Sequence, residues 1–142
     1  MARLFAIHDY DNKLKRKGAF EIKPEEVQEL NKQGYGIYMC VNEFNGARKI
    51  ENLQKINFWI ADLDSGTKLD MINRIEELVL QPSIIVETKK GYHCYWKAEN
   101  ATFENYTEIE KGLIKKLNAD KACKDVTRLL RFPTSYHMKN PE

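Results

Sequence analysis

An apolar run that ends in two acids constrains this chain more than any other feature of its sequence. Residues 58–61 are apolar, and residues 62–66 continue as Asp-Leu-Asp-Ser-Gly. A short apolar run bounded by a turn signal is typical of a central strand buried on both faces. Side chains alternate along a strand, so Asp62 and Asp64 point the same way at its end. Two carboxylates at such a short distance repel each other, and a bound divalent cation would remove that repulsion.

The size and composition of the chain indicate an ordinary globular protein. Its 142 residues, 42% hydrophobic and 31% charged, predict a single domain over 1–142. The net charge of +2 is too small to indicate nucleic-acid binding by itself. No apolar run approaches the roughly 20 residues of a membrane helix, so no membrane partner is expected. The three cysteines lack CxxC spacing and favour reduced thiols in a cytoplasmic protein over disulfides or a zinc site.

The order of apolar patterns and turn residues predicts an α+β fold, with helices packed on a mostly antiparallel sheet. Helical spacing and end signals predict helices over 24–34, from Thr67 to Pro82, and over 103–117. The apolar stripe of the second helix is expected to include Leu69, Ile72, Ile75 and Val79. Runs of β-forming residues predict the strands, at 4–7, 35–41, 58–63, 83–87, 92–97 and 126–132.

A second motif joins a lysine-containing turn to a strand that carries a histidine. Residues 88–91 read Thr-Lys-Lys-Gly, and the strand 92–97 follows directly. Alternation along this strand puts the apolar side chains at 92, 94 and 96 on one face and His93 on the other. A glycine turn can approach phosphates closely, with backbone N–H groups and lysine ammonium groups as donors. His93 is a lone strand histidine, which is more often structural, but this setting suits a phosphate contact.

A third motif follows near the C-terminus and is rich in phosphate-binding and metal-binding groups. An acid, two arginines, a proline turn, a histidine and a lysine occur there within one short stretch. The planar fork of arginine matches phosphate oxygens in a way that a merely solvated surface does not require. The residues concerned are Asp125, Arg128, Arg131, Pro133, His137 and Lys139.

Taken in this order, the three motifs resemble those of the archaeo-eukaryotic primase superfamily. The resemblance covers residues 37–141 and is closest to RepB-like plasmid and phage replication primases and to primase-polymerases. In that family a DxD/E pair ends an apolar strand, a strand with a histidine follows, and a third acid precedes two arginines. The chain departs from the family pattern at Lys89-Lys90, where Ser-Pro is usual, and at Thr134, where glycine is usual.

The resemblance implies an RRM-like primase-polymerase core and a metal-dependent nucleotidyltransferase. Such an enzyme makes or extends primers from nucleoside triphosphates on a single-stranded DNA template. Two Mg²⁺ or Mn²⁺ ions would be held by Asp62, Asp64 and Asp125; Asp120 competes for the third place, and Asp125 is favoured because it adjoins the predicted last strand.

The resemblance also implies how the nucleotide is bound. His93, Lys90 and Arg131 would bind its phosphates, and His93 belongs with the acids to the catalytic set. Arg128, His137 and Lys139 would make further contacts to nucleotide or template.

Other functions remain open on the sequence alone. A metal-dependent nuclease also uses carboxylates and a histidine, and a catalytically silent nucleic-acid-binding domain could keep the same fold. A rolling-circle nicking protein is disfavoured because none of the three histidines is adjacent to another. Since primases often precede a helicase, the chain is expected to be a catalytic domain excised from a longer replication protein, with a helicase domain or partner.

Overall fold

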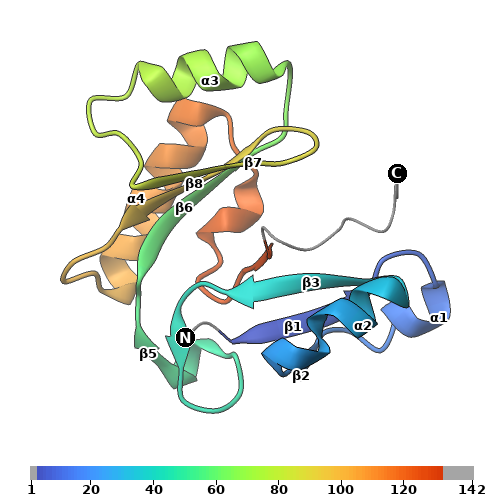
Figure 1. Cartoon of the computed structure of the whole chain (residues 1–142). Coiled ribbons are helices and arrows are strands. Elements are labelled where there is room, and N and C mark those ends of the chain that lie inside the picture. Colours follow the sequence, from blue (N-terminus) through green and yellow to red (C-terminus); the bar gives the residue numbers. More distant parts are fainter. Residues whose placement is uncertain (1–2, 133–142) are drawn as a thin grey trace. The chain divides into compact units, whose positions relative to one another are not determined.

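The computed structural model describes residues 3–132, which form two compact units: residues 3–41 with 129–132, and residues 42–128 (Figure 1). The first unit is built on a four-stranded antiparallel sheet in the order β2-β1-β3-β9. Its elements, in chain order, are β1 (Leu4–His8), α1 (Asn12–Lys15), β2 (Phe20–Ile22), the 3₁₀ turn η1 (Pro24–Glu26), α2 (Val27–Lys32), β3 (Tyr35–Cys40) and β9 (Leu129–Arg131).

The core of the first unit lies on one face of its sheet. Leu4, Ala6 and Ile37 alternate along β1 and β3 and are buried there, as strand periodicity requires. The helix α2 packs Val27 and Leu30 against this face. The predicted strands at 4–7 and 35–41 are therefore confirmed, and the predicted helix over 24–34 is confirmed with a 3₁₀ turn as its first part.

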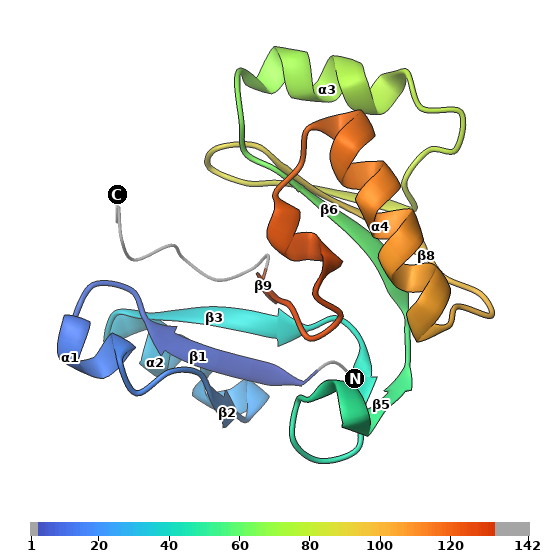
Figure 2. The ribbon, with the colours of Figure 1, turned by 180° about the vertical axis from the view of Figure 1, so that it is seen from behind.

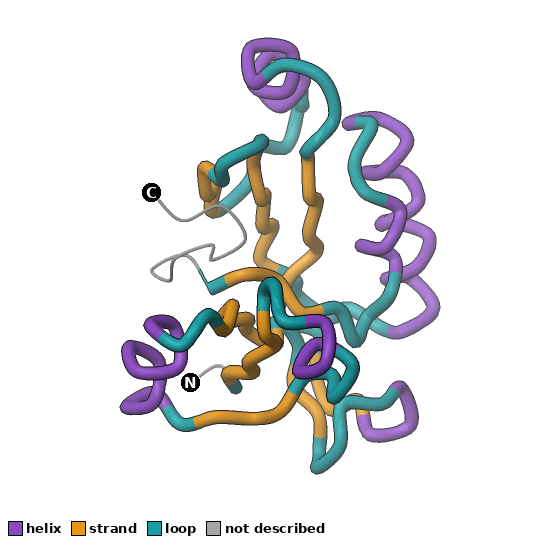
Figure 3. Tube along the Cα trace, turned by 90° about the vertical axis from the view of Figure 1, so that its right-hand side faces the viewer, coloured by secondary structure: helices purple, strands orange, loops and turns teal. Residues whose placement is uncertain are grey.

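The second unit carries a three-stranded antiparallel sheet in the order β6-β8-β7 and a separate β4-β5 hairpin. The helices α3 and α4 pack on one face of the larger sheet, and α4 crosses in front of β6 and β8 in Figure 2 and stands beside the strands in Figure 3. The elements are β4 (Glu43–Phe44), the 3₁₀ turn η2 (Ile50–Asn52), β5 (Leu53–Lys55), β6 (Phe58–Leu63), α3 (Lys68–Glu76), β7 (Ile84–Glu87), β8 (Tyr92–Lys97), α4 (Phe103–Leu117) and the 3₁₀ turn η3 (Lys121–Lys124).

The strand β6 lies at the edge of its sheet, although the sequence predicted a central strand buried on both faces. Its apolar character has another cause. The fully buried carboxyl group of Glu110 on α4 accepts a hydrogen bond from the Ile60 N–H at 3.0 Å (Oε2). A helix thus satisfies a backbone group that would otherwise be left open at the sheet edge. Because the helix α4 covers this edge, β6 has the apolar composition of a buried strand.

The helix α3 is shorter than predicted, and part of its predicted apolar stripe is wrong. It begins with Thr67 as N-cap, whose hydroxyl accepts from the Asp70 N–H, as the sequence indicated. It ends at Glu76, so Val79 lies beyond it and is 98% exposed, and Leu69 is also exposed. The side-chain amide of Gln81 donates to the carbonyls of the last turn and beyond, which ends the helix before Pro82.

The remaining predictions differ from the structure only at the ends of elements. The strands at 83–87 and 92–97 and the helix over 103–117 are confirmed, and every strand pairing within residues 3–132 is antiparallel. The last predicted strand, 126–132, is reduced to β9, because the Arg128 N–H donates to the Asp125 carbonyl and closes a turn first. The predicted α+β class is confirmed.

Two further sequence expectations can be compared with residues 3–132. All three cysteines are free and buried, and burial raises the pKa of the Cys94 and Cys123 thiols to about 12. Thiols in this state are protonated and unreactive near neutral pH. Within the same residues, no helix is long and apolar enough to cross a membrane.

The buried Glu110 makes stability depend on pH. Burial raises the pKa of its carboxyl group from 4.5 to about 8, so the folded protein keeps a proton that the unfolded chain loses in between. The contribution of Glu110 to the free energy of unfolding is therefore largest below pH ~4.5. It falls as the pH rises toward ~8, by up to about 1.4 kcal/mol per pH unit. We expect Glu110→Gln, which keeps an acceptor for Ile60, to flatten this fall in urea unfolding at pH 5, 7 and 9. The exposed neighbour Glu108→Gln should retain it; equal pH profiles for the two variants would contradict the prediction.

Candidate active site

The end of β6 places two acids beside a histidine of β8. Asp62 lies directly opposite His93 in the antiparallel register. His93 is buried, and its Nε2 lies 3.4 Å from Asp62 Oδ1. The opposite face of β8, with Cys94 and Trp96, packs into the core under α3 and α4, as predicted. Core packing on one face thus fixes the acid and the histidine on the other.

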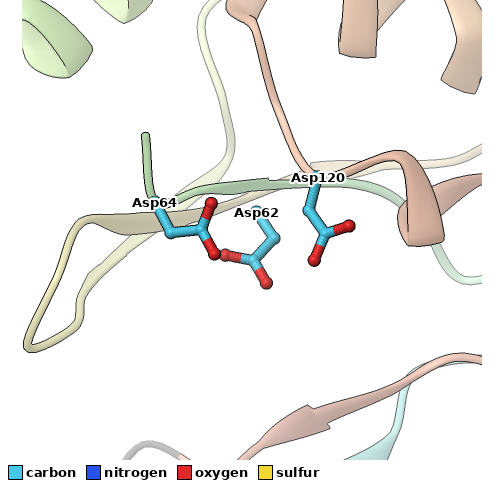
Figure 4. Close-up of side chains that lie close together, drawn as sticks. All are labelled: Asp62, Asp64 and Asp120. Atoms are coloured by element: carbon cyan, nitrogen blue, oxygen red, sulfur yellow. The ribbon is translucent and has the colours of Figure 1, made fainter. Parts of the chain in front are cut away.

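A third acid reaches this group from the end of α4. The helix stops at Asn118, which adopts a left-handed conformation (φ 53°), and the chain then turns toward β6. The Asp120 N–H donates to the carbonyl of Asp62 at 2.8 Å. Carboxylate oxygens of Asp62, Asp64 and Asp120 consequently lie within 4.8 Å of one another, and Figure 4 shows the three groups gathered together.

The structure thus assembles the group with Asp120 rather than Asp125, which the sequence had favoured. Asp125 is exposed, and its Oδ1 accepts from the N–H (2.9 Å) and the hydroxyl (2.8 Å) of Thr127. The preference for Asp125 rested on a strand expected to begin at residue 126. Since residues 125–128 form a turn instead, adjacency in sequence does not bring Asp125 to the other acids.

The acid group is electrostatically strained, and two cations partly relieve it. Partial desolvation, followed by the charges of Asp62 and Asp120, raises the pKa of the Asp64 carboxyl group. The charges of Lys90 and Arg128 act in the opposite direction. Arg128 Nη2 lies 3.3 Å from Asp120 Oδ2 and 3.6 Å from Asp62 Oδ2. Three hard oxygen donors with excess negative charge are the ligand set that Mg²⁺ and Mn²⁺ take, so these residues fit a divalent cation.

The turn between β7 and β8 is fixed against β6 by a glycine. The Thr88 N–H donates to the Gly91 carbonyl at 2.8 Å, and the Gly91 N–H donates to the Thr88 hydroxyl at 3.0 Å. A Cβ atom on Gly91 would overlap the backbone carbonyl of Leu63. Only glycine allows this approach, and it brings Lys90 near enough for its charge to oppose the rise in the pKa of Asp64.

Of the three remaining predicted residues, the structure describes one, Arg131. Arg131 belongs to the first unit, where Nη1 and Nη2 each approach one oxygen of buried Asp9, at 3.3 and 3.2 Å. Arg131 also donates to the Tyr38 hydroxyl at 2.8 Å and stacks on that ring. Sequence reasoning missed Asp9, whose only signal was its place directly after an apolar strand. His137 and Lys139 lie outside the described residues.

Comparisons with known proteins agree with this architecture. No family model matches the chain. A replication protein of Clostridium perfringens is 24% identical over 134 residues, covering 83% of this chain and 33% of that protein. The chain therefore spans about a third of the length of this relative.

Among solved structures, the AEP domain of the primase-polymerase of cyanophage S-2L matches 99% of this chain and 77% of that chain, with a TM-score of 0.81 and 21% identity. The fold is that of a primase-polymerase AEP domain. A second similar structure is the catalytic domain of the primase RepB′ in complex with initiator DNA. It matches 98% of this chain and 71% of that chain, with a TM-score of 0.65 and 19% identity.

The contact at Gly91 predicts a large difference between two glycine-to-alanine variants. We expect Gly91→Ala to lower the free energy of unfolding by about 1–3 kcal/mol, because the new methyl group meets the backbone rather than a flexible side chain. Gly112, an exposed glycine within α4, has open space around it, and Gly112→Ala should raise stability by about 0.5–1 kcal/mol. Urea unfolding of both variants measures the difference. Equal stabilities would show that the turn does not need this glycine.

Proposed function

We propose that this protein is a metal-dependent nucleotidyltransferase of the primase-polymerase kind, which synthesises or extends primers on single-stranded DNA. The observation that carries the proposal is the group of three carboxylates, with His93 beside it, on an AEP fold. Plasmid or phage replication is the setting that the resemblance suggests, and the similarity to a replication protein supports it.

The metal ligands would be Asp62, Asp64 and Asp120. When bound, two Mg²⁺ or Mn²⁺ ions supply activation of the primer 3′-hydroxyl and neutralisation of the triphosphate charge. The backbone of this set would be in place before a cation binds, because β6 carries Asp62, Asp64 follows its last residue, and the Asp120 N–H donates to the Asp62 carbonyl. A site held by rigid elements does not have to be ordered when the cation binds.

The cationic groups around the acids would bind the incoming nucleoside triphosphate. Lys90 is carried by the β7–β8 turn, where an exposed lysine can reach phosphate oxygens. His93 lies close to Asp62, with Nε2 3.4 Å from Oδ1, and a ring nitrogen of His93 that carries a proton would donate to a phosphate oxygen. Arg128 contacts two of the three acids and would exchange these partners for phosphate oxygens.

The chain as a whole would act as one catalytic domain of a longer replication protein in the cytoplasm. Its coverage of a third of the Clostridium perfringens protein supports this proposal. A helicase domain or partner stays a prediction from the family resemblance.

Nucleotide incorporation tests the proposal directly. We expect the wild type to incorporate labelled nucleotides on single-stranded DNA with Mg²⁺ or Mn²⁺, and Asp62→Asn with Asp64→Asn to reduce incorporation by at least about a hundredfold. Asp70→Asn, at an exposed position of the first turn of α3, is the matched control and should stay near wild type.

Other results would point to other functions. Metal-dependent shortening of the DNA without incorporation would replace the polymerase with a nuclease. DNA binding with neither reaction, and no binding of Mn²⁺ or nucleotide, would leave a catalytically silent binding domain.

Arg128 gives a separate prediction about metal affinity. Its guanidinium already neutralises Asp62 and Asp120, and therefore competes with a cation for the same oxygens. Arg128→Gln should bind Mn²⁺ several-fold more tightly than the wild type in calorimetry or electron paramagnetic resonance. Arg16→Gln removes an exposed charge of the first unit and should leave the affinity unchanged. Weaker Mn²⁺ binding by Arg128→Gln would mean instead that the arginine holds the carboxylates in position.

A further inference from the structure

A pocket outside the acid group is lined by four exposed lysines. Lys111 and Lys115 come from the second half of α4, and Lys121 and Lys124 come from η3. Apolar residues of the helix end, Ile114 and Ala119, lie between them. None of the acidic residues in the described range 3–132 lines the pocket, so the described lining carries one sign of charge.

Helix stability alone does not explain the arrangement of the lysines. Lys111 and Lys115 are four residues apart and therefore neighbours on the surface of α4, where like charges repel. Lysines near a helix C-terminus complement its dipole, which accounts for Lys115. The dipole does not account for Lys121 and Lys124, which the following turn adds to the same pocket.

The four lysines also lack compensating partners inside the protein. Within residues 3–132, none of them forms an ion pair, whereas Lys68 pairs with Glu87 and Arg3 with Glu21. Uncompensated like charge around one hollow is the expected state of a site whose counter-charge comes from a ligand.

We propose that this pocket binds phosphate groups of a nucleic-acid strand; the choice of a nucleic acid rests on the proposed function. Lysine ammonium groups are compact charges on flexible stems, which bind phosphates without reading bases. Such a site would position a strand of any sequence, as template handling requires. The shared chemistry is phosphate, and the experiment below separates a strand from a free polyphosphate.

The pocket is linked to the acid group by a short stretch of chain. Residues 118–124 supply Asp120 to the acids and Lys121 and Lys124 to the pocket. A strand bound in the pocket would therefore hold the segment whose backbone hydrogen bond fixes Asp120 beside Asp62. DNA binding and completion of the acid group are coupled through this segment.

Anisotropy of a labelled oligothymidine, measured with the full chain in EDTA, tests the pocket without metal or catalysis. The variant Lys115→Ala with Lys124→Ala removes two pocket lysines. The matched control, Lys116→Ala with Lys55→Ala, removes two exposed lysines outside the pocket. The logarithm of the affinity falls linearly with the logarithm of the salt concentration. Loss of two phosphate contacts on a single strand should reduce the magnitude of this slope by about 1.4. The wild type should then lose about sevenfold more affinity than the pocket variant between roughly 50 and 200 mM salt, and the control should follow the wild type.

A second titration with inorganic tripolyphosphate identifies the source of the phosphate. If the pocket variant weakens oligothymidine binding, alone or together with tripolyphosphate binding, the ligand is a strand, as proposed. If only tripolyphosphate binding weakens, the pocket takes a free polyphosphate, and the strand proposal is overturned. Equal behaviour of the pocket variant and the control with both ligands would remove the site altogether.

The two proposals fail in different ways. Because the anisotropy experiment contains EDTA and no nucleotide, a wild type that cannot incorporate nucleotides can still show lysine-dependent DNA binding. Conversely, if the enzyme is active but the salt dependence of its DNA affinity does not change when Lys115 and Lys124 are replaced, the proposed function stands and the proposed pocket is wrong. Unfolding curves of the variants exclude loss of structure as the cause of weaker binding.

Discussion

The outer edge of β6 determines both the stability of the second unit and the formation of its acid group. An edge strand leaves backbone groups open, and two of them are satisfied by elements far away in the sequence. The Ile60 N–H donates to the carboxyl group of Glu110 on α4, and the Asp62 carbonyl accepts from the Asp120 N–H. The second bond brings an acid to the two that stand at the end of β6. Protection of the edge and assembly of the site are therefore the same structural event.

The group of Asp62, Asp64 and Asp120 concentrates negative charge, and the repulsion among these carboxylates does not stabilise the fold. The pKa of Asp64 is raised by partial desolvation and by its acidic neighbours, so this carboxyl group ionises less readily than a free aspartate. Arg128 and Lys90 reduce the repulsion, and His93 lies against Asp62 on the neighbouring strand. A group of carboxylates in which one pKa is shifted by its charged neighbours is typical of a functional site. The lysine pocket has the opposite sign, and one segment, residues 118–124, contributes to both.

Local patterns in the sequence predicted the parts of the site that depend on local structure. Strand alternation placed Asp62 and Asp64 together and His93 on the face away from the core, and the glycine turn stands where expected. Asp120 and Glu110 could not be chosen in this way. Their positions depend on where α4 ends and on how it packs against β6, which are tertiary facts. The preference for Asp125 failed because a turn replaced the expected start of a strand.

The contacts of the two arginines of the third motif could not be predicted from the sequence either. These contacts suggest that the two arginines have different roles. Arg131 is bound to a buried carboxylate, Asp9, and to Tyr38 within the first unit. Withdrawing a guanidinium from a buried ion pair typically costs about 3–5 kcal/mol, because the remaining charge is left uncompensated. Arg128 contacts two acids that a metal ion would neutralise in its place. Its release would cost far less, so Arg128 is the better candidate for a triphosphate contact, and Arg131 for a residue that holds β9 in the first sheet.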